Sequence, residues 1–341
     1  MKTRHHRLLT TILLFSLWTS ACATTTNRVP DIPSALDPQG PAAANIANLW
    51  WLLFGLGTAV FVVVTALLLF IVVTHRRSGD ILEPDLRAPD HRTWIWWGGV
   101  IAPAIILGIT LFFTLRSHSA LAYPPTPPVL TIEVIGRQWW WEVRYPDHEI
   151  TTANEIYIPA GQPVNFRLTT ADVIHSFWVP ELNGKIDMIP GKTNTLWLQA
   201  TESGIYRGLC AEFCGIQHAK MQYLVIAVPP AEFDKWIEQQ RQPAPAPTDE
   251  ITRRGQQIFL GSACVYCHAI RGTNASGQLG PDLTHLASRR TLGAGILPNN
   301  RGTLGGWTIN SQHIKPGNHM PPMNLDGAEL QALLDYLATL Q

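Results

Sequence analysis

Two thiols, one imidazole and one thioether lie within twelve residues of this chain, in the stretch CAEFCGIQHAKM at positions 210–221. Soft sulfur ligands together with imidazole form the ligand set that suits copper. A mononuclear copper site of the blue type needs one cysteine, two histidines and a weak axial methionine. The second cysteine therefore indicates two copper ions that share bridging thiolates. His175 lies upstream, in the stretch VIHSF, and supplies another imidazole.

Two other kinds of site would use the same cysteines. Cys210 and Cys214 could form a disulfide, as is common in exported domains, or they could bind a structural zinc ion together with histidine. Neither alternative gives Met221 a role or accounts for the order of the ligands in the stretch.

A second group of reactive side chains lies near the C-terminus. Cys264, Cys267 and His268 form the pattern C-x-x-C-H. This pattern is typical of c-type haem attachment, in which both thiols bond covalently to the haem and the adjacent imidazole binds the iron. A redox-active disulfide or half of a zinc site also uses C-x-x-C, but neither needs the histidine that follows directly.

The copper-type ligands lie in a region, residues 129–228, that has the pattern of half-buried β-strands. Val164, Phe166 and Leu168, for example, alternate with polar residues, and such alternation places apolar side chains on one face of a strand. About seven strands in about 100 residues indicate a β-sandwich or barrel. The expected strands are 129–135, 139–145, 155–158, 164–169, 195–199, 205–209 and 222–228.

The haem-type ligands lie in a C-terminal unit, residues 249–341, that has the pattern of helices. A proline-rich linker, residues 241–248, precedes this unit, and its prolines favour an extended spacer of about 3 Å per residue. Gly255 would allow two helices to cross closely, because it has no side chain. Asp326 and Glu329 have the spacing of a capping box. Apolar residues recur at helical spacing near both ends of the unit, namely Ile251, Ile258 and Phe259, and Leu330, Leu333, Leu334 and Leu337.

Two long apolar stretches precede the β region. Residues 46–73 and 94–115 contain no charged side chain, and each is longer than the roughly 20 residues that a helix needs to span a bilayer. We therefore expect a transmembrane helix hairpin over residues 46–115. The connecting loop, 75–92, contains four arginines, whereas residues 23–45 contain one. Because positive charge favours the cytoplasmic side, the regions after the second helix should lie outside the cytoplasm.

Residues 1–22 have the features of an export signal of the lipoprotein type. Basic residues precede an apolar run at 8–18, and small residues precede Cys22, where a lipid would be attached. Thr19 stands where such signals usually have leucine, so ordinary cleavage nearby is the alternative.

The helix pair, the tryptophan run at 139–141, His175 and the stretch CAEFCGIQHAKM together resemble subunit II of the haem-copper cytochrome c oxidases over residues 46–228. This resemblance implies a cupredoxin-like Greek-key β-sandwich that binds the dinuclear copper A centre. It also implies a magnesium ion at the contact with subunit I, toward which the Glu212 side chain would point. The implied copper ligands are the bridging thiolates of Cys210 and Cys214, the imidazoles of His175 and His218, the thioether of Met221 and the backbone carbonyl of Glu212.

The stretch GRQWWW at 136–141 resembles the aromatic patch through which electrons reach the copper in this family. Trp139 is the first candidate for that role and Trp140 is the second. Strand alternation places Trp139 and Trp141 on one face and Trp140 on the other, so core packing must explain at least one of the three. Arg137 stands where the family commonly has a histidine.

The unit that begins at about residue 248 resembles a class I cytochrome c, which is an all-α domain. The stretch LGPDL at 279–283 matches a loop whose proline carbonyl, here that of Pro281, accepts a hydrogen bond from the ligand histidine. The resemblance implies a sixth iron ligand from the stretch NHMPPM at 318–323. Met320, which directly precedes a proline, is the first candidate, Met323 is the second and His319 is the third.

A subunit II joined to a cytochrome c domain is the arrangement of the caa3-type oxidases. The resemblance implies that electrons from cytochrome c or another respiratory donor pass through haem c to copper A and then to subunit I. Subunit I would reduce oxygen to water and pump protons, as part of cytochrome-c oxidase (EC 7.1.1.9). The implied partners are subunit I, other oxidase subunits and membrane lipid, in the inner membrane of a bacterium with both domains on the periplasmic side. No nucleic-acid partner is expected, since 25 basic residues balance 25 acidic ones.

Two other functions would use the same features. One is an electron-transfer subunit of a nitrogen-oxide reductase, several of which combine copper A or haem c with other centres. The other is a copper-binding or redox-sensing membrane protein that needs no catalytic partner. The helix pair directly before the β region favours the oxidase.

Overall fold

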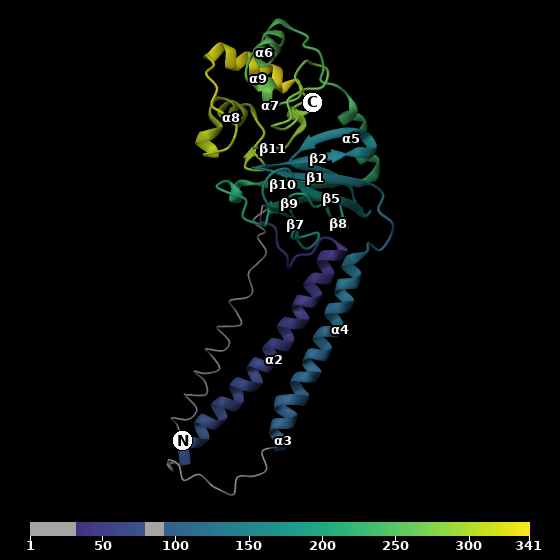
Figure 1. Ribbon diagram of the computed structural model, residues 1–341, viewed down its shortest axis with the longest axis vertical. Helices are drawn as coiled ribbons and strands as arrows, with labels where there is room; N and C mark the ends of the chain where they lie inside the picture. Colours follow the sequence, from purple (N-terminus) through teal and green to yellow (C-terminus); the bar gives the residue numbers. More distant parts are fainter. Residues whose placement is uncertain (1–31, 79–91) are drawn as a thin grey trace, which may run out of the picture. The chain divides into compact units, whose positions relative to one another are not determined.

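The computed structural model describes residues 32–78 and 92–341 (Figure 1). The expected signal at residues 1–22, including Cys22, lies outside the described residues, as does most of the arginine-containing loop. We refer to residues 129–228 as the β domain and to residues 249–341 as the C-terminal domain.

Two apolar helices, α2 (Pro41–Ser78) and α4 (Ala102–Ala122), lie side by side (Figure 1). The short helices α3 (Arg92–Trp94) and η1 (Ile95–Ile101) continue directly into α4. Large apolar side chains on both helices are exposed; Phe61 is 68% and Leu107 is 67% exposed. Because both helices are long and apolar enough to cross a bilayer, these side chains are suited to contact lipid. The prediction of two apolar helices over 46–73 and 94–115 is confirmed.

The β domain is a sandwich of two five-stranded sheets with the strand orders β3-β2-β1-β5-β8 and β4-β10-β9-β6-β7. Each sheet mixes antiparallel pairs with one parallel pair, β1 with β5 and β10 with β4. The strands are β1 (Thr131–Arg137), β2 (Trp140–Tyr145), β3 (Ile150–Ala153), β4 (Glu155–Pro159), β5 (Val164–Thr170), β6 (His175–Trp178), β7 (Ile186–Met188), β8 (Asn194–Leu198), β9 (Gly204–Cys210) and β10 (Gln222–Val228).

The core of the β domain lies between the two sheets. Alternate residues of β1 and β5, including Ile132, Val134, Phe166 and Leu168, are completely buried, as the period of two along a strand requires. The predicted sandwich is therefore confirmed, and each of the seven expected strands overlaps an observed one. The short strands β3, β6 and β7 were not predicted, because three or four residues are too few to show an alternating pattern.

The C-terminal domain is mostly helical. It contains α6 (Glu250–Gly261), α7 (Cys264–Cys267), α8 (Arg301–Ile314) and α9 (Gly327–Ala338), with a short 3-10 helix η4 (Leu286–Ser288) and the two-stranded ribbon β11 (Thr291–Leu292) and β12 (Leu297–Pro298). Helix α5 (Pro230–Arg241) ends where the proline-rich stretch begins, and residues 243–248 form neither helix nor strand.

Helices α6 and α9 cross at Gly255. A Cβ atom on this residue would overlap the carbonyl group of Ala332 and would lie 2.7 Å from the Cβ of Tyr336, so the close crossing predicted from Gly255 is confirmed. The expected capping box is also present, since the Asp326 carboxylate accepts from the Glu329 amide at 2.8 Å and the Glu329 carboxylate accepts from the Asp326 amide. Ile251, at the start of α6, is 58% exposed, so it does not belong to the buried face that contains Gly255 and Phe259.

A Gly255→Ala substitution is expected to destabilise the C-terminal domain by about 2 kcal/mol, because the added methyl group forces α6 and α9 apart. Thermal unfolding followed by circular dichroism measures this change. Gly306→Ala is the matched control, since Gly306 lies in α8 and no atom comes within 4 Å of its added Cβ. That control should unfold at or slightly above the wild-type temperature. Equal effects of the two substitutions would mean that the close crossing contributes nothing.

Candidate copper and haem sites

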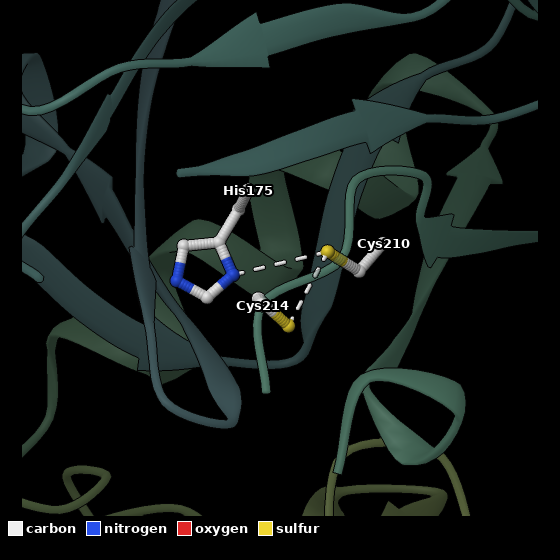
Figure 2. Close-up of side chains that lie close together, drawn as sticks. All are labelled: His175, Cys210 and Cys214. Atoms are coloured by element: carbon white, nitrogen blue, oxygen red, sulfur yellow. Dashed lines mark hydrogen bonds between the residues drawn. The ribbon is translucent and has the colours of Figure 1, made fainter. Parts of the chain in front are cut away.

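Three potential metal ligands meet inside the β domain. The side chains of His175, Cys210 and Cys214 point toward one another (Figure 2), and their ligand atoms all lie within 4.8 Å of one another. The Sγ of Cys210 lies 3.8 Å from the Sγ of Cys214 and 3.8 Å from the Nδ1 of His175. All three residues are buried. Both thiols are free, and their separation is far greater than the 2.05 Å of a disulfide.

The other three predicted ligands lie against the same two sulfur atoms. The Nδ1 of His218 lies 3.7 Å from the Sγ of Cys214, and the Sδ of Met221 lies 3.8 Å from it. The carbonyl oxygen of Glu212 lies 3.2 Å from the Sγ of Cys210, whereas the Glu212 side chain is exposed. Two thiolates, two imidazoles, one thioether and one carbonyl thus face a common centre. This donor set fits copper better than zinc, because thioether and carbonyl ligands are not part of usual structural zinc sites.

The sandwich fixes this ligand set at the ends of neighbouring strands. His175 begins β6 and Cys210 ends β9, and the two strands pair with Phe177 opposite Cys210. The loop that follows Cys210 returns immediately to β10, since the Cys210 amide donates to the Met221 carbonyl at 3.1 Å. Gly136 on β1 leaves room for the imidazole, because a Cβ there would lie 2.8 Å from the Cδ2 of His175. A rigid site of this kind needs little rearrangement when its charge changes.

Asp172 orients the His175 ring, and it was not predicted from the sequence. Its Oδ1 lies 2.8 Å from the Nε2 of His175, which leaves Nδ1 directed at the sulfur atoms. Burial lowers the pKa of His175, but hydrogen bonds with Asp172 and Cys210 outweigh burial, so the net shift is upward. The pKa of Cys210 is lowered, chiefly by its hydrogen bond with Cys214, whose own pKa is raised by the same contact. A carboxylate that accepts a hydrogen bond from a ligand histidine is a common arrangement in metal sites. The position of Asp172, three residues before His175, was the sequence feature from which this contact could have been predicted.

Trp139 contacts the ligand loop directly. It is 8% exposed, and its indole Nε1 donates to the carbonyl oxygen of Cys214 at 2.9 Å. Trp139 lies in the turn before β2, whereas Trp140 is the first residue of β2 and is half-buried, with the guanidinium of Arg137 over its ring at 5.6 Å. Trp141 is completely buried, and its ring lies 6.0 Å from that of His175. Of the two electron-inlet candidates, Trp139 is therefore the one in contact with a predicted copper ligand.

The haem-type ligands lie around α7. Cys264 and Cys267 are half-buried at its two ends, and His268 follows it. The Nδ1 of His268 lies 2.7 Å from the carbonyl oxygen of Pro281, which leaves Nε2 free for a metal. Burial lowers the pKa of His268, and the neutral imidazole is the form that binds iron. A Cβ on Gly280 would lie 2.6 Å from the His268 ring. These features fit a haem held by two thiols and one oriented imidazole.

Among the candidates for the sixth iron ligand, Met320 has the most firmly held backbone. Its carbonyl accepts hydrogen bonds from Ser311 and Gln312, both at 2.8 Å, and its amide donates to the Asn318 side chain. Met323 is held by one backbone hydrogen bond, from its amide to the carbonyl of Ile309. His319 is turned toward the β domain, since its ring centroid lies 5.3 Å from that of Trp139. Met320 therefore remains the first candidate.

Known families match both regions of the chain. Residues 148–228 match the family described as the periplasmic domain of cytochrome c oxidase subunit II, and residues 252–341 match the cytochrome c family. These matches imply copper A in the first region and haem in the second, and they are consistent with a membrane-anchored protein whose β domain is periplasmic.

Proteins called cytochrome c oxidase subunit 2 are similar over most of the chain. The one from Alkalihalophilus pseudofirmus is 36% identical over 315 residues, which are 90% of this chain and 91% of that protein. The one from Bacillus sp. strain PS3 is 32% identical over 78% of this chain and 79% of its own length. The one from Bacillus subtilis is 28% identical over 99% of this chain and 98% of its own length. The chain therefore belongs to the cytochrome c oxidase subunit 2 family, in its form with a fused cytochrome c domain.

Proposed function

We propose that this chain receives electrons for a haem-copper terminal oxidase of the caa3 type and delivers them to subunit I. The observation that carries this proposal is the convergence of two imidazoles, one thioether and one carbonyl on the thiols of Cys210 and Cys214, in the same chain as a C-x-x-C-H motif whose histidine is oriented by Pro281. Haem c and copper A each supply reversible one-electron transfer when bound. Reduction of oxygen and proton pumping are assigned to subunit I.

The residues of this chain hold and shield the two groups. Cys210 and Cys214 are assigned as bridging copper ligands and His175, His218, Met221 and the Glu212 carbonyl as terminal ones. Cys264 and Cys267 are assigned to covalent haem attachment and His268 and Met320 to the iron. The burial of Cys210, Cys214 and His175 would keep water from the metal, so little solvent would have to rearrange when the charge of the metal changes.

The remaining assignments concern the surroundings of the chain. We assign the external donor to cytochrome c or another respiratory carrier, and the host to a bacterial inner membrane in which residues 46–115 span the lipid. The exposed carboxylate of Glu212 is assigned to a magnesium ion shared with subunit I. The β domain, the linker at 241–248 and the C-terminal domain are assigned to the periplasmic side.

Purification of the affinity-tagged full-length chain from its own membrane tests this function. We expect a stable complex that contains subunit I, haem a and copper, and that consumes oxygen when an electron donor is added. A complex that instead reduces nitrogen oxides and lacks haem a would assign the chain to a reductase. A chain that binds copper but purifies without any other subunit would contradict the oxidase role.

A further inference from the structure

A buried lysine lies where the C-terminal domain meets the β domain. Lys315 directly follows α8 and is 2% exposed. Its Nζ donates hydrogen bonds to the carbonyl oxygen of Trp139 at 3.1 Å and to that of Gly293 at 3.0 Å. One acceptor belongs to the β domain and the other to the C-terminal domain. The side chain thus joins the two domains at the electron-inlet candidate.

The chemistry of this contact suits an amine better than an ammonium ion. Burial, together with the nearby charge of Lys220, lowers the pKa of Lys315 to about 7, although Cys214 opposes this shift. A neutral amine avoids the cost of a buried charge, and its two N–H groups equal the two carbonyl acceptors in number. Lys315 can therefore satisfy both domains without a carboxylate partner.

The backbone on both sides of Lys315 is also held by the copper-ligand loop. Lys220 donates to the carbonyl oxygen of Ile314, and Gln217 donates to that of Pro316, both at 2.6 Å. Gly317, with a φ of +79°, lies so close to the loop that a Cβ would overlap the Ile216 side chain. Three consecutive residues, 314–316, thus each have a hydrogen bond to the β domain.

A second attachment lies away from this loop and prevents rotation about the first. The Glu155 carboxylate, on β4, is 3% exposed and accepts from the amides of Arg290 and Thr291, both at 2.8 Å, and from the Thr291 hydroxyl. The Gln222 amide, on β10, donates to the carbonyl of Ala294 at 3.0 Å. Two separated sets of hydrogen bonds, most of them partly buried, define one relative orientation of the domains.

We propose that Lys315 is a positioning residue that keeps the C-terminal domain docked on the β domain throughout turnover. This inference rests on the electron-transfer function proposed above. Docking holds the His319 ring against the Trp139 indole, which in turn donates to Cys214. Each transfer would move one electron from the haem that Cys264, Cys267 and His268 would hold to the copper pair that Cys210 and Cys214 would hold, so the haem would be oxidised by one unit and the copper pair reduced by one without release of the domain. The linker supplies attachment, and Lys315 fixes the position of the C-terminal domain at Trp139.

Lys315→Met tests the proposal in the purified complete oxidase. A light-activated ruthenium reductant injects one electron into haem c, and absorbance changes report its transfer to copper. We expect the substitution to slow this transfer about tenfold or more, since small misplacements of reacting groups have effects of this size. Lys235→Met, at an exposed position of α5, is the matched control and should leave the rate unchanged. A Lys315→Met rate within about twofold of wild type would overturn the proposal.

The dependence of the same rate on solvent viscosity tests docking without relying on a variant. A permanently docked pair transfers electrons at a rate that glycerol does not alter, whereas a domain that must diffuse back is slowed by it. We expect no viscosity effect in the wild type and a clear one in Lys315→Met. A wild-type rate that falls in proportion to viscosity would show that the domains separate in each cycle.

The pH profile of stability separates this role from simple packing. In the unfolded chain Lys315 has its ordinary pKa of 10.5, and in the folded chain about 7. The unfolded state therefore binds more protons between these values, so the stability of wild type relative to Lys315→Met should rise with pH from about 7 toward 10. A flat difference would mean that Lys315 is not buried. Unaltered haem and copper spectra in every variant show that the proposed function itself is intact.

Discussion

Replacing Cys214 with serine is expected to abolish the two-copper centre while the sandwich remains folded. The Nδ1 of His218 and the Sδ of Met221 both lie within 3.8 Å of the Cys214 sulfur. The same sulfur lies 3.8 Å from that of Cys210, so Cys214 connects His218 and Met221 to the remaining ligands. A serine hydroxyl does not ionise at neutral pH and is a harder ligand than a thiolate. The remaining ligands can hold at most one copper ion in the manner of a mononuclear site.

Electron paramagnetic resonance and near-infrared absorption of the purified chain measure this outcome. The mixed-valence two-copper signal should disappear, and electron flow from haem to oxygen in the complete oxidase should fall about 100-fold or more, because even groups behind metal ligands contribute 10- to 100-fold. Ser203→Ala, at an exposed turn of the same domain, should retain the signal and the rate. A two-copper signal that survives Cys214→Ser would exclude the bridging assignment.

Replacing Met320 with leucine is expected to remove the sixth iron ligand and to lower the haem potential by on the order of 100 mV, because methionine ligation raises the potential. The side chains of Ser311, Gln312 and Asn318 hold the backbone at position 320, so leucine should occupy the same place without local unfolding. Loss of the iron–methionine charge-transfer band and redox titration measure the two effects.

Met323→Leu is the matched control for this experiment. Met323 lies three positions after Met320 and is likewise half-buried. The Met323→Leu variant is nevertheless expected to retain both the band and the potential. The opposite result, in which Met323→Leu loses the band and Met320→Leu retains it, would transfer the ligand assignment to Met323. If the wild type itself lacks the band, no methionine binds the iron, and His319 becomes the remaining candidate from the sequence.

The local motifs could be predicted because their ligands are close in sequence. CAEFCGIQHAKM and C-x-x-C-H each supply several ligands from a few residues, so spacing alone restricts the chemistry. The two apolar helices and most strands were predicted for a similar reason, since their patterns repeat over many residues. Strand β6, which carries His175, was missed because four residues that are nearly all buried show no alternation.

Residues that act through distant contacts could not be predicted in this way. Asp172 and Gly136 orient the His175 ring because they lie against it. Gly136 reaches this ring only because the two sheets pack face to face. Lys315 is 176 positions from Trp139 in sequence, and nothing in its neighbours distinguishes it from a solvent-exposed lysine. The exposure of Ile251 could not be predicted either, because helical periodicity identifies one face of a helix but not how much of that face the partner helix covers.

The contact between Trp139 and the C-terminal domain changes the kinetic order of electron transfer to the copper. Lys315 and His319 of the C-terminal domain contact Trp139, which is 8% exposed, so a soluble carrier would have to displace this domain to reach the indole. Passage from haem to copper then becomes a first-order process, independent of dilution, and only the loading of the haem depends on donor concentration. A low donor concentration would therefore lower the rate at which the haem is reduced, but not the rate at which an electron then passes from haem to copper.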